Sequence, residues 1–159
     1  MSDFLVIGIG NPIMSDDGVG VHAVRYLEGR LPDNVELIEG NVCCADLLPF
    51  LENRRKVVFI DGVDAGAEPG TVFRFSPEEV RKRKGIEPIS LHDFGVYELI
   101  TAARLLDGCP GEITLLAVQV KNVEVGEELS QEVLEAIPRI HKLLLDDLGV
   151  TDSDEIPED

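Results

Sequence analysis

The stretch VIGIGNPIMSDDGVGV, residues 6–21, constrains the fold more than any other part of the chain. An apolar run leads into a Gly-Ile-Gly triplet, a short loop follows, and a segment with helical spacing begins after two acids, Asp16 and Asp17. This order is typical of a buried strand, a tight loop and a helix that Gly20 lets pack close to a sheet. The triplet suggests a dinucleotide-binding loop, but that motif needs a third glycine where this chain has Ile13. Adjacent acids also repel a pyrophosphate, so the stretch indicates a ligand other than a dinucleotide.

The rest of the chain predicts strands alternating with helices. Continuous apolar runs predict buried strands at residues 4–9, 35–38, 57–60 and 113–120. Helical spacing predicts helices at residues 18–30, 44–53, 91–107 and 128–147. Pro138 should kink or split the last helix, and residues 71–75, which follow a Pro-Gly turn, are predicted to run antiparallel. The predicted fold class is α/β, a three-layer sandwich with a mostly parallel central sheet flanked by helices and one antiparallel strand.

Two polar features lie before the predicted helix at 91–107 or at its start. Residues 77–91 are basic and polar, which predicts an exposed helical turn and a loop, and the run of charges at 81–84 is interpreted as a solvated face. Ser90 and Asp93 have the spacing of a capping box at the start of that helix.

Charge and composition narrow the class of protein. Lys and Arg number 14 against 31 Asp and Glu, a net charge of −17, which disfavours nucleic acid and membrane surfaces as partners. No linker divides the chain, so residues 1–149 are predicted to form one domain and the acidic residues 150–159 a disordered tail. No basic leader precedes the first strand, and no apolar run reaches the roughly 18 residues of a membrane span. Three cysteines, with Cys43 and Cys44 adjacent, do not form a disulfide framework, so we expect buried thiols and a cytoplasmic protein.

Acidic side chains follow two of the predicted strands. Asp16 and Asp17 come after the first strand, and Asp61 ends the third, with Asp64 shortly after it. Ligands of parallel sheets bind beyond the carboxyl ends of the strands, so we expect these acids at one edge. His92 lies in the first turn of a predicted helix, where the helix dipole favours a neutral imidazole that can bind metal or accept a proton.

Two carboxylates and one imidazole with open coordination positions suit a borderline divalent metal such as nickel or zinc. The same groups could serve as a general acid and base around a bound water. Structural roles stay open for each: Asp16 as a helix N-cap, Asp17 as a partner of the helix dipole, Asp61 as a turn residue and His92 as a capping residue. The chain has no G-x-S-x-G, H-E-x-x-H or C-x-x-C motif, and its other histidines, His22 and His141, are interpreted as surface or rim residues.

Three sequence blocks, in this order, closely resemble the nickel–iron hydrogenase maturation endopeptidases: GIGNPIMSDDGVGV, VVFIDGVDAG with PGTVFRF, and SLHDFGV. The resemblance spans roughly residues 4–148. It implies a protease that removes a C-terminal extension from the hydrogenase large-subunit precursor after nickel insertion. The nickel, supplied in the precursor, is the recognition signal, and no organic cofactor is implied. Carried across, the metal-contacting and catalytic residues are Asp17, Asp61 and His92. The chain departs from the family in residues 39–44, where a glycine-rich segment with a threonine is usual.

Two other functions remain as alternatives. A metal-dependent docking or chaperone module for the same precursor would use the same ligands without cutting. Peptidyl-tRNA hydrolases also begin with a strand and a G-x-G-N-P-like loop, but they need a basic surface that this acidic chain lacks. We expect a monomer, because no amphipathic stripe is left over for a partner.

Overall fold

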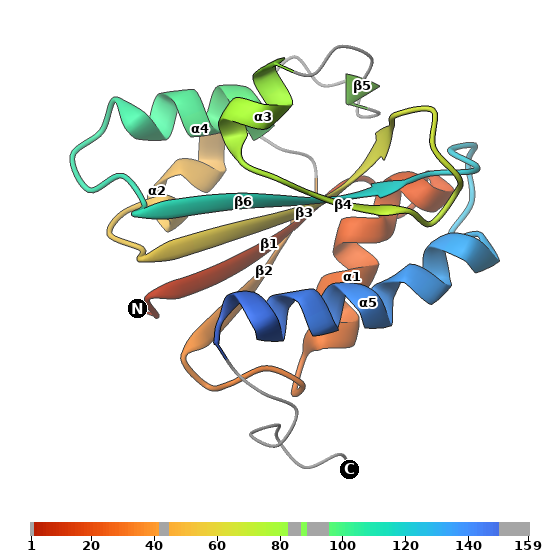
Figure 1. The fold of residues 1–159 in the computed structure, drawn as a ribbon, viewed down its shortest axis with the longest axis horizontal. Coiled ribbons are helices and arrows are strands. Elements are labelled where there is room, and N and C mark those ends of the chain that lie inside the picture. Colours follow the sequence, from red (N-terminus) through yellow and green to blue (C-terminus); the bar gives the residue numbers. More distant parts are fainter. Residues whose placement is uncertain (1, 42–44, 83–86, 89–95, 150–159) are drawn as a thin grey trace.

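The computed structural model describes residues 2–41, 45–82, 87–88 and 96–149. Its sheet has the strand order β2-β1-β3-β6-β4, with β5 paired to the end of β3 (Figure 1). The first three pairs along this order are parallel, and β4 runs antiparallel to β6, as predicted for residues 71–75. The strands are β1 (Phe4–Ile9), β2 (Val35–Asn41), β3 (Lys56–Asp64), β4 (Val72–Phe75), β5 (Glu87–Pro88) and β6 (Glu112–Gln119).

Helices cover both faces of the sheet and make the three layers that the sequence predicts (Figure 1). On one face lie α1 (Val19–Leu27) and α5 (Gln131–Asp147), and on the other α2 (Leu48–Leu51) and α4 (Val96–Arg104). A short helix, α3 (Pro77–Lys82), packs against α4 and β4. Because side chains alternate along a strand, β1 contributes Leu5, Ile7 and Ile9 to one apolar core and Val6 to the other. No helix in the described part of the chain is long and apolar enough to cross a membrane.

Several element bounds differ from the sequence predictions. The third strand does not end at residue 60, because β6 pairs with β3 as far as Val63 and Gln119, so Asp61 lies inside β3. Pro138 does not split α5, which begins at Gln131 and is assigned as one helix. The predicted helix at 44–53 is described as a 3₁₀ helix, η2 (Ala45–Leu47), followed by α2. The sequence also did not predict β5, whose two residues pair antiparallel with the end of β3.

Some predicted features lie outside the described residues. These are the thiols of Cys43 and Cys44, the capping box of Ser90 and Asp93, and the acidic tail at 150–159.

Glycines bring the start of α1 directly onto the sheet. A Cβ added at Gly20 would lie 2.2 Å from the carbonyl oxygen of Ile60 and 2.4 Å from that of Ile9. Gly10, with a φ of 136°, is equally close to the backbone of Asp17, 1.8 Å from an added Cβ to the carbonyl oxygen. No side chain fits between these backbones. The 3₁₀ helix η1 (Ser15–Gly18), which precedes α1, is therefore held against the carboxyl ends of β1 and β3.

Candidate functional site

Two buried carboxylates meet at the carboxyl edge of the sheet. Asp17 comes from η1 and is 5% exposed, and Asp61 comes from β3 and is 7% exposed. The Oδ2 atom of Asp17 accepts a hydrogen bond of 3.0 Å from the backbone N–H of Asn11. The Oδ1 atom of Asp61 accepts one of 2.8 Å from the N–H of Gly62. The structure thus brings together two of the three residues predicted from the sequence.

The pKa of Asp61 is raised well above its ordinary value. Burial is the largest cause, the hydrogen bond from Gly62 opposes it, and the nearby charge of Asp17 raises the pKa further. A cation placed between the two acids would offset both the lost hydration and their mutual repulsion. The pair is therefore suited either to bind a metal ion or, with Asp61 protonated, to exchange a proton with a bound water.

The third predicted residue, His92, lies outside the described residues, so its position relative to the two acids stays a prediction. Within the part of the chain that the structure describes, no group of three or more His, Cys, Asp or Glu side chains is arranged to hold a metal ion. Two carboxylates supply oxygen donors and leave most coordination positions of a divalent metal open. A metal ion bound by these two acids would need further ligands.

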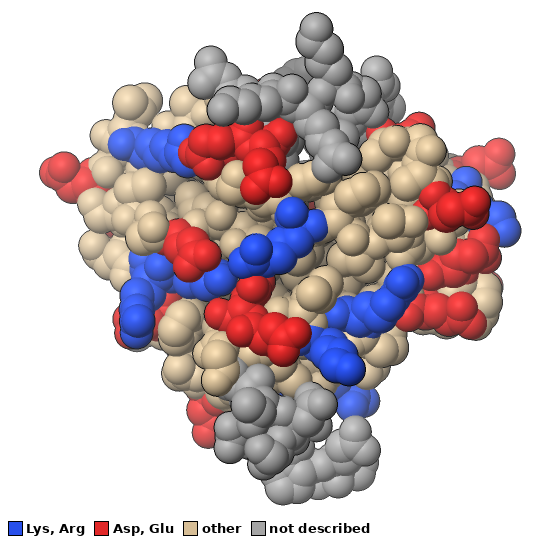
Figure 2. Space-filling view, viewed as in Figure 1, with Lys and Arg blue, Asp and Glu red and all other residues tan. Residues whose placement is uncertain are grey.

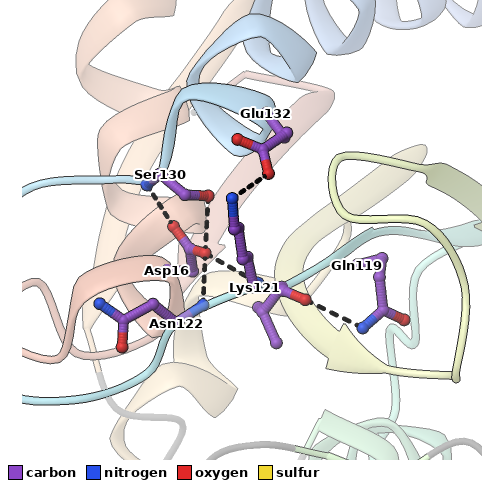
Figure 3. A network of polar contacts seen from close by, with 7 residues as sticks. Asp16, Gln119, Lys121, Asn122, Ser130 and Glu132 are labelled. Carbon is purple, nitrogen blue, oxygen red and sulfur yellow. Dashed lines mark hydrogen bonds and ion pairs between the residues drawn. The ribbon is translucent and has the colours of Figure 1, made fainter.

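One interpretation of the sequence makes Asp16 the N-cap of the helix, but Asp16 does not cap α1. The N-cap residue is Gly18, which makes no side-chain cap bond. Asp16 is fully buried, and Figure 3 shows its carboxylate among groups from the far end of the chain. It accepts the backbone N–H groups of Lys121 (2.8 Å), Asn122 (3.0 Å) and Ser130 (2.7 Å), and the Ser130 hydroxyl (2.8 Å). The residue before Asp17 therefore fastens η1 to the loop between β6 and α5.

Asp64 has other hydrogen-bond partners than Asp61 has. It is exposed, and its Oδ1 accepts hydrogen bonds from the Gly66 N–H and the Gln119 side chain, each 3.3 Å long. Gln119 in turn accepts the N–H groups of Ala65 at 2.8 Å and Ala67 at 3.2 Å. Asp64 and Gln119 thus fix the loop after β3, which borders the site. Sequence reasoning did not identify Gln119 or Ser130, because nothing in their immediate neighbours marks these roles.

The other two histidines, His22 and His141, lie on helices and contact backbone groups. His141 lies on α5, and its Nε2 is 2.9 Å from the carbonyl oxygen of Arg30. His22 on α1 is half-buried, and its Nε2 has no hydrogen-bond partner among the described residues. Burial, together with the charge of Arg25, lowers the pKa of His22, while a hydrogen bond to the backbone of Glu127 partly opposes this. His22 thus lies against the loop between β6 and α5 with its pKa lowered.

The family model described as hydrogenase maturation protease matches residues 21–147. This chain belongs to the hydrogenase maturation protease family. The resemblance inferred from the three sequence blocks is therefore confirmed.

Relatives in this family include the hydrogenase expression/formation protein HupD of Bradyrhizobium diazoefficiens, 37% identical over 122 residues, which are 76% of this chain and 64% of the relative. HupD of Rhodobacter capsulatus is also 37% identical over 122 residues, 76% of this chain and 58% of the relative. The chain thus spans less than two thirds of the length of these two. The hydrogenase 2 maturation protease of Escherichia coli is 32% identical over 123 residues, 76% of this chain and 74% of the relative.

Solved structures of maturation proteases share the fold. The hydrogenase maturating endopeptidase HybD of Escherichia coli has a TM-score of 0.82 at 28% identity, and the match covers 99% of this chain and 98% of that one. The [NiFe] hydrogenase maturation protease HybD of Thermococcus kodakarensis has a TM-score of 0.76 at 25% identity, covering 93% and 99%. The predicted α/β sandwich is thus the architecture of this maturation protease family.

The hydroxyl of Ser15, two residues before Asp17, has a structural partner. Ser15 is the hydroxyl nearest in sequence to Asp17, but it donates its Oγ hydrogen bond to the carbonyl oxygen of Glu124 at 2.7 Å. A serine nucleophile needs instead a base that accepts its proton. Ser15 thus fastens η1 to the loop after β6.

Proposed function

We propose that this chain is an endopeptidase that removes the C-terminal extension of a nickel–iron hydrogenase large-subunit precursor once nickel is in place. In this proposal Asp17, Asp61 and His92 contact the nickel that the precursor brings. Membership of the maturation protease family supports the reaction and the substrate. The observation that carries the site is the buried pair of Asp17 and Asp61, whose mutual repulsion a cation would offset.

An incomplete ligand set explains how nickel could act as a checkpoint. Two carboxylates and one imidazole bind a metal ion weakly when they act alone. They bind well when the precursor already holds the ion and leaves positions open for them. Discrimination between empty and loaded precursors then follows from the difference in binding free energy between the two states.

The cleavage step needs only water and a carboxylate. A water oxygen attacks the scissile carbonyl, Asp61 accepts a water proton, and the proton then passes to the leaving amine as the C–N bond breaks. Asp61 suits this role because a carboxylate that takes a proton from water can return it to the leaving amine. Asp61 thus acts first as a base, when water attacks, and then as an acid, when the amine leaves.

The test mixes the purified protein with its cognate large-subunit precursor, with or without nickel, and follows precursor mass. The Asp17→Asn, Asp61→Asn and His92→Ala variants run beside it, with Asp64→Asn as a matched carboxylate control. We expect loss of a C-terminal peptide from the loaded precursor alone, slowed by about a hundredfold or more in the three site variants but not in the control. Nickel-dependent binding without cleavage would instead establish a docking module. If the precursor is not bound and not cut, the proposed substrate is wrong.

A further inference from the structure

Exposed apolar side chains gather where two loops meet beside the site. Ile13 is 55% exposed, and Val123 and Val125, in the loop between β6 and α5, are 36% and 83% exposed. A parallel bridge between Met14 and Gly126 joins the loops, and it places Ile13 beside Val125, since these residues precede the two bridge partners. We call Ile13, Val123 and Val125 the rim patch. Exposed apolar groups concentrated in this way mark surfaces that bind other molecules.

The rim patch adjoins an acidic groove. A cavity of about 450 Å³ is lined by Val125 and Leu129 together with Glu127 and Glu128. Residues 122–130 contain three glutamates and neither Lys nor Arg. The basic residue nearest in sequence, Lys121, is paired with Glu132, the Nζ and Oε2 atoms being 2.7 Å apart. Acidic side chains, with a few Lys or Arg among them, gather along the side of the molecule where this loop and the start of α5 lie (Figure 2). The groove thus combines apolar surface with negative charge.

A chain of hydrogen bonds links the rim patch to the carboxylate site. The backbone N–H of Asn11 donates to Asp17, and the Asn11 side chain accepts the N–H of Ile13 at 3.1 Å. The carbonyl oxygen of Ile13 accepts the N–H of Gly126 at 2.9 Å. The loop that carries Ile13 is therefore bonded both to Asp17 and to the loop between β6 and α5.

We propose that the rim patch and its acidic groove form the docking surface for a segment of the hydrogenase precursor that carries apolar side chains flanked by Lys or Arg. This inference rests on the proposed function. A stable protein–protein contact covers about 800 Å² on each partner, far more than two buried carboxylates offer. Apolar anchors supply most of the binding energy in such contacts, and complementary charge selects the partner.

Charge argues against two other occupants. The chain's own C-terminal residues 150–159 contain five acids and no base, so the groove repels them. A second copy of a chain with a net charge of −17 is repelled in the same way. A basic and apolar segment of a different protein is the occupant that the surface favours.

The test measures KM and kcat for cleavage of the nickel-loaded precursor by two groups of variants. The first is the double variant Ile13→Ser, Val125→Ser, and its matched control is Leu105→Ser, a side chain that is 85% exposed after the end of α4. The second is the triple variant Glu124→Lys, Glu127→Lys, Glu128→Lys. Its control is the same reversal at Glu28, Glu52 and Asp107, which are exposed and follow α1, α2 and α4.

We expect KM to rise about tenfold or more in the double variant with kcat within about twofold of the unchanged protein. The triple variant should raise KM several-fold at low salt and little at high salt, because salt screens exposed charges. Both controls should leave KM unchanged. A photo-crosslinking residue at position 125 should capture the precursor, and one at position 105 should not.

The outcomes separate this inference from the proposed function. If the unchanged protein cuts the precursor while the double and triple variants keep its KM, the docking surface is wrong and the proposed function stands. Capture of a second copy of the chain at position 125 also overturns the inference. If the unchanged protein itself neither binds nor cuts the precursor, the proposed function fails and the docking surface falls with it.

Discussion

Asp17 lies close enough to Asp61 for its charge to raise the pKa of Asp61, in addition to the larger effect of burial. One acid belongs to a 3₁₀ turn and the other to the interior of a central strand. Their closeness depends on glycines that let two backbones touch. The fold thus keeps two like charges together at some cost in stability, and this cost can be measured.

Asp61→Asn should stabilise the metal-free protein at neutral pH. An acid with a raised pKa in the folded state favours folding below its ordinary pKa, and that contribution is lost as pH rises towards the folded value. Asparagine resembles the protonated acid and keeps the bond from Gly62, so its advantage over the unchanged protein should grow by up to about 1.4 kcal/mol per pH unit. Urea denaturation with a chelator between pH 4 and pH 8 measures it. A difference that does not change with pH would contradict the explanation.

Asp16→Ala should be strongly destabilising even though Asp16 is not a predicted metal ligand. It removes the acceptor of three N–H groups and one hydroxyl in a fully buried position. The expected loss in unfolding free energy is about 3–5 kcal/mol. Ser130→Ala removes only one of these bonds, so it should cost about 1 kcal/mol. Equal costs for the two variants in urea denaturation would show that the network of Figure 3 does not hold η1.

Gly20→Ala separates helix propensity from packing, because the two predict opposite signs. Propensity alone predicts a gain of about 1 kcal/mol for alanine inside a helix. The contacts of 2.2 Å and 2.4 Å with carbonyl oxygens predict a loss instead, of about 3 kcal/mol or more, because backbone atoms cannot yield. Gly149→Ala is the control, since its added Cβ meets nothing and only its φ of 73° costs about 1 kcal/mol. Thermal denaturation of both variants decides the sign.

Asp64→Asn should leave cleavage of the loaded precursor within about twofold of the unchanged rate. Its Oδ1 is occupied by Gly66 and Gln119, and asparagine keeps an oxygen for both. Gln119→Ala, by contrast, should slow cleavage several-fold, since it frees the loop that borders the site. If Asp64→Asn abolished cleavage, as Asp61→Asn is expected to do, both acids would be needed for the reaction.

The sequence predicted the layers well because they depend on local patterns. Apolar runs marked β1, β3 and β6, and a Pro-Gly turn correctly indicated that β4 runs antiparallel. The bounds were less accurate. Extension of β3 through Asp61 depends on pairing with β6, which lies far along the chain, and nothing beside residue 60 indicates it.

The site could be predicted only in part for the same reason. Asp17 and Asp61 were placed at one edge from their positions after apolar runs, and the structure confirms this. Capping preference predicts that Asp16 caps the helix, because it considers only the nearest amides. Its actual partners, Lys121, Asn122 and Ser130, lie more than a hundred residues further along the chain. His92 stays a prediction, since it lies outside the described residues.

The anchoring of η1 by residues 121–130 also sets when the site can form. A growing chain leaves the ribosome from its N-terminus, so β1, η1 and β3 emerge before any partner of Asp16 has been made. Until residues 121–130 are available, the hydrogen bonds that fasten η1, the turn that carries Asp17, cannot form. The carboxylate pair is therefore fixed in place only after residues 121–130 have been made, and a chain truncated before them would retain both acids without these bonds to η1.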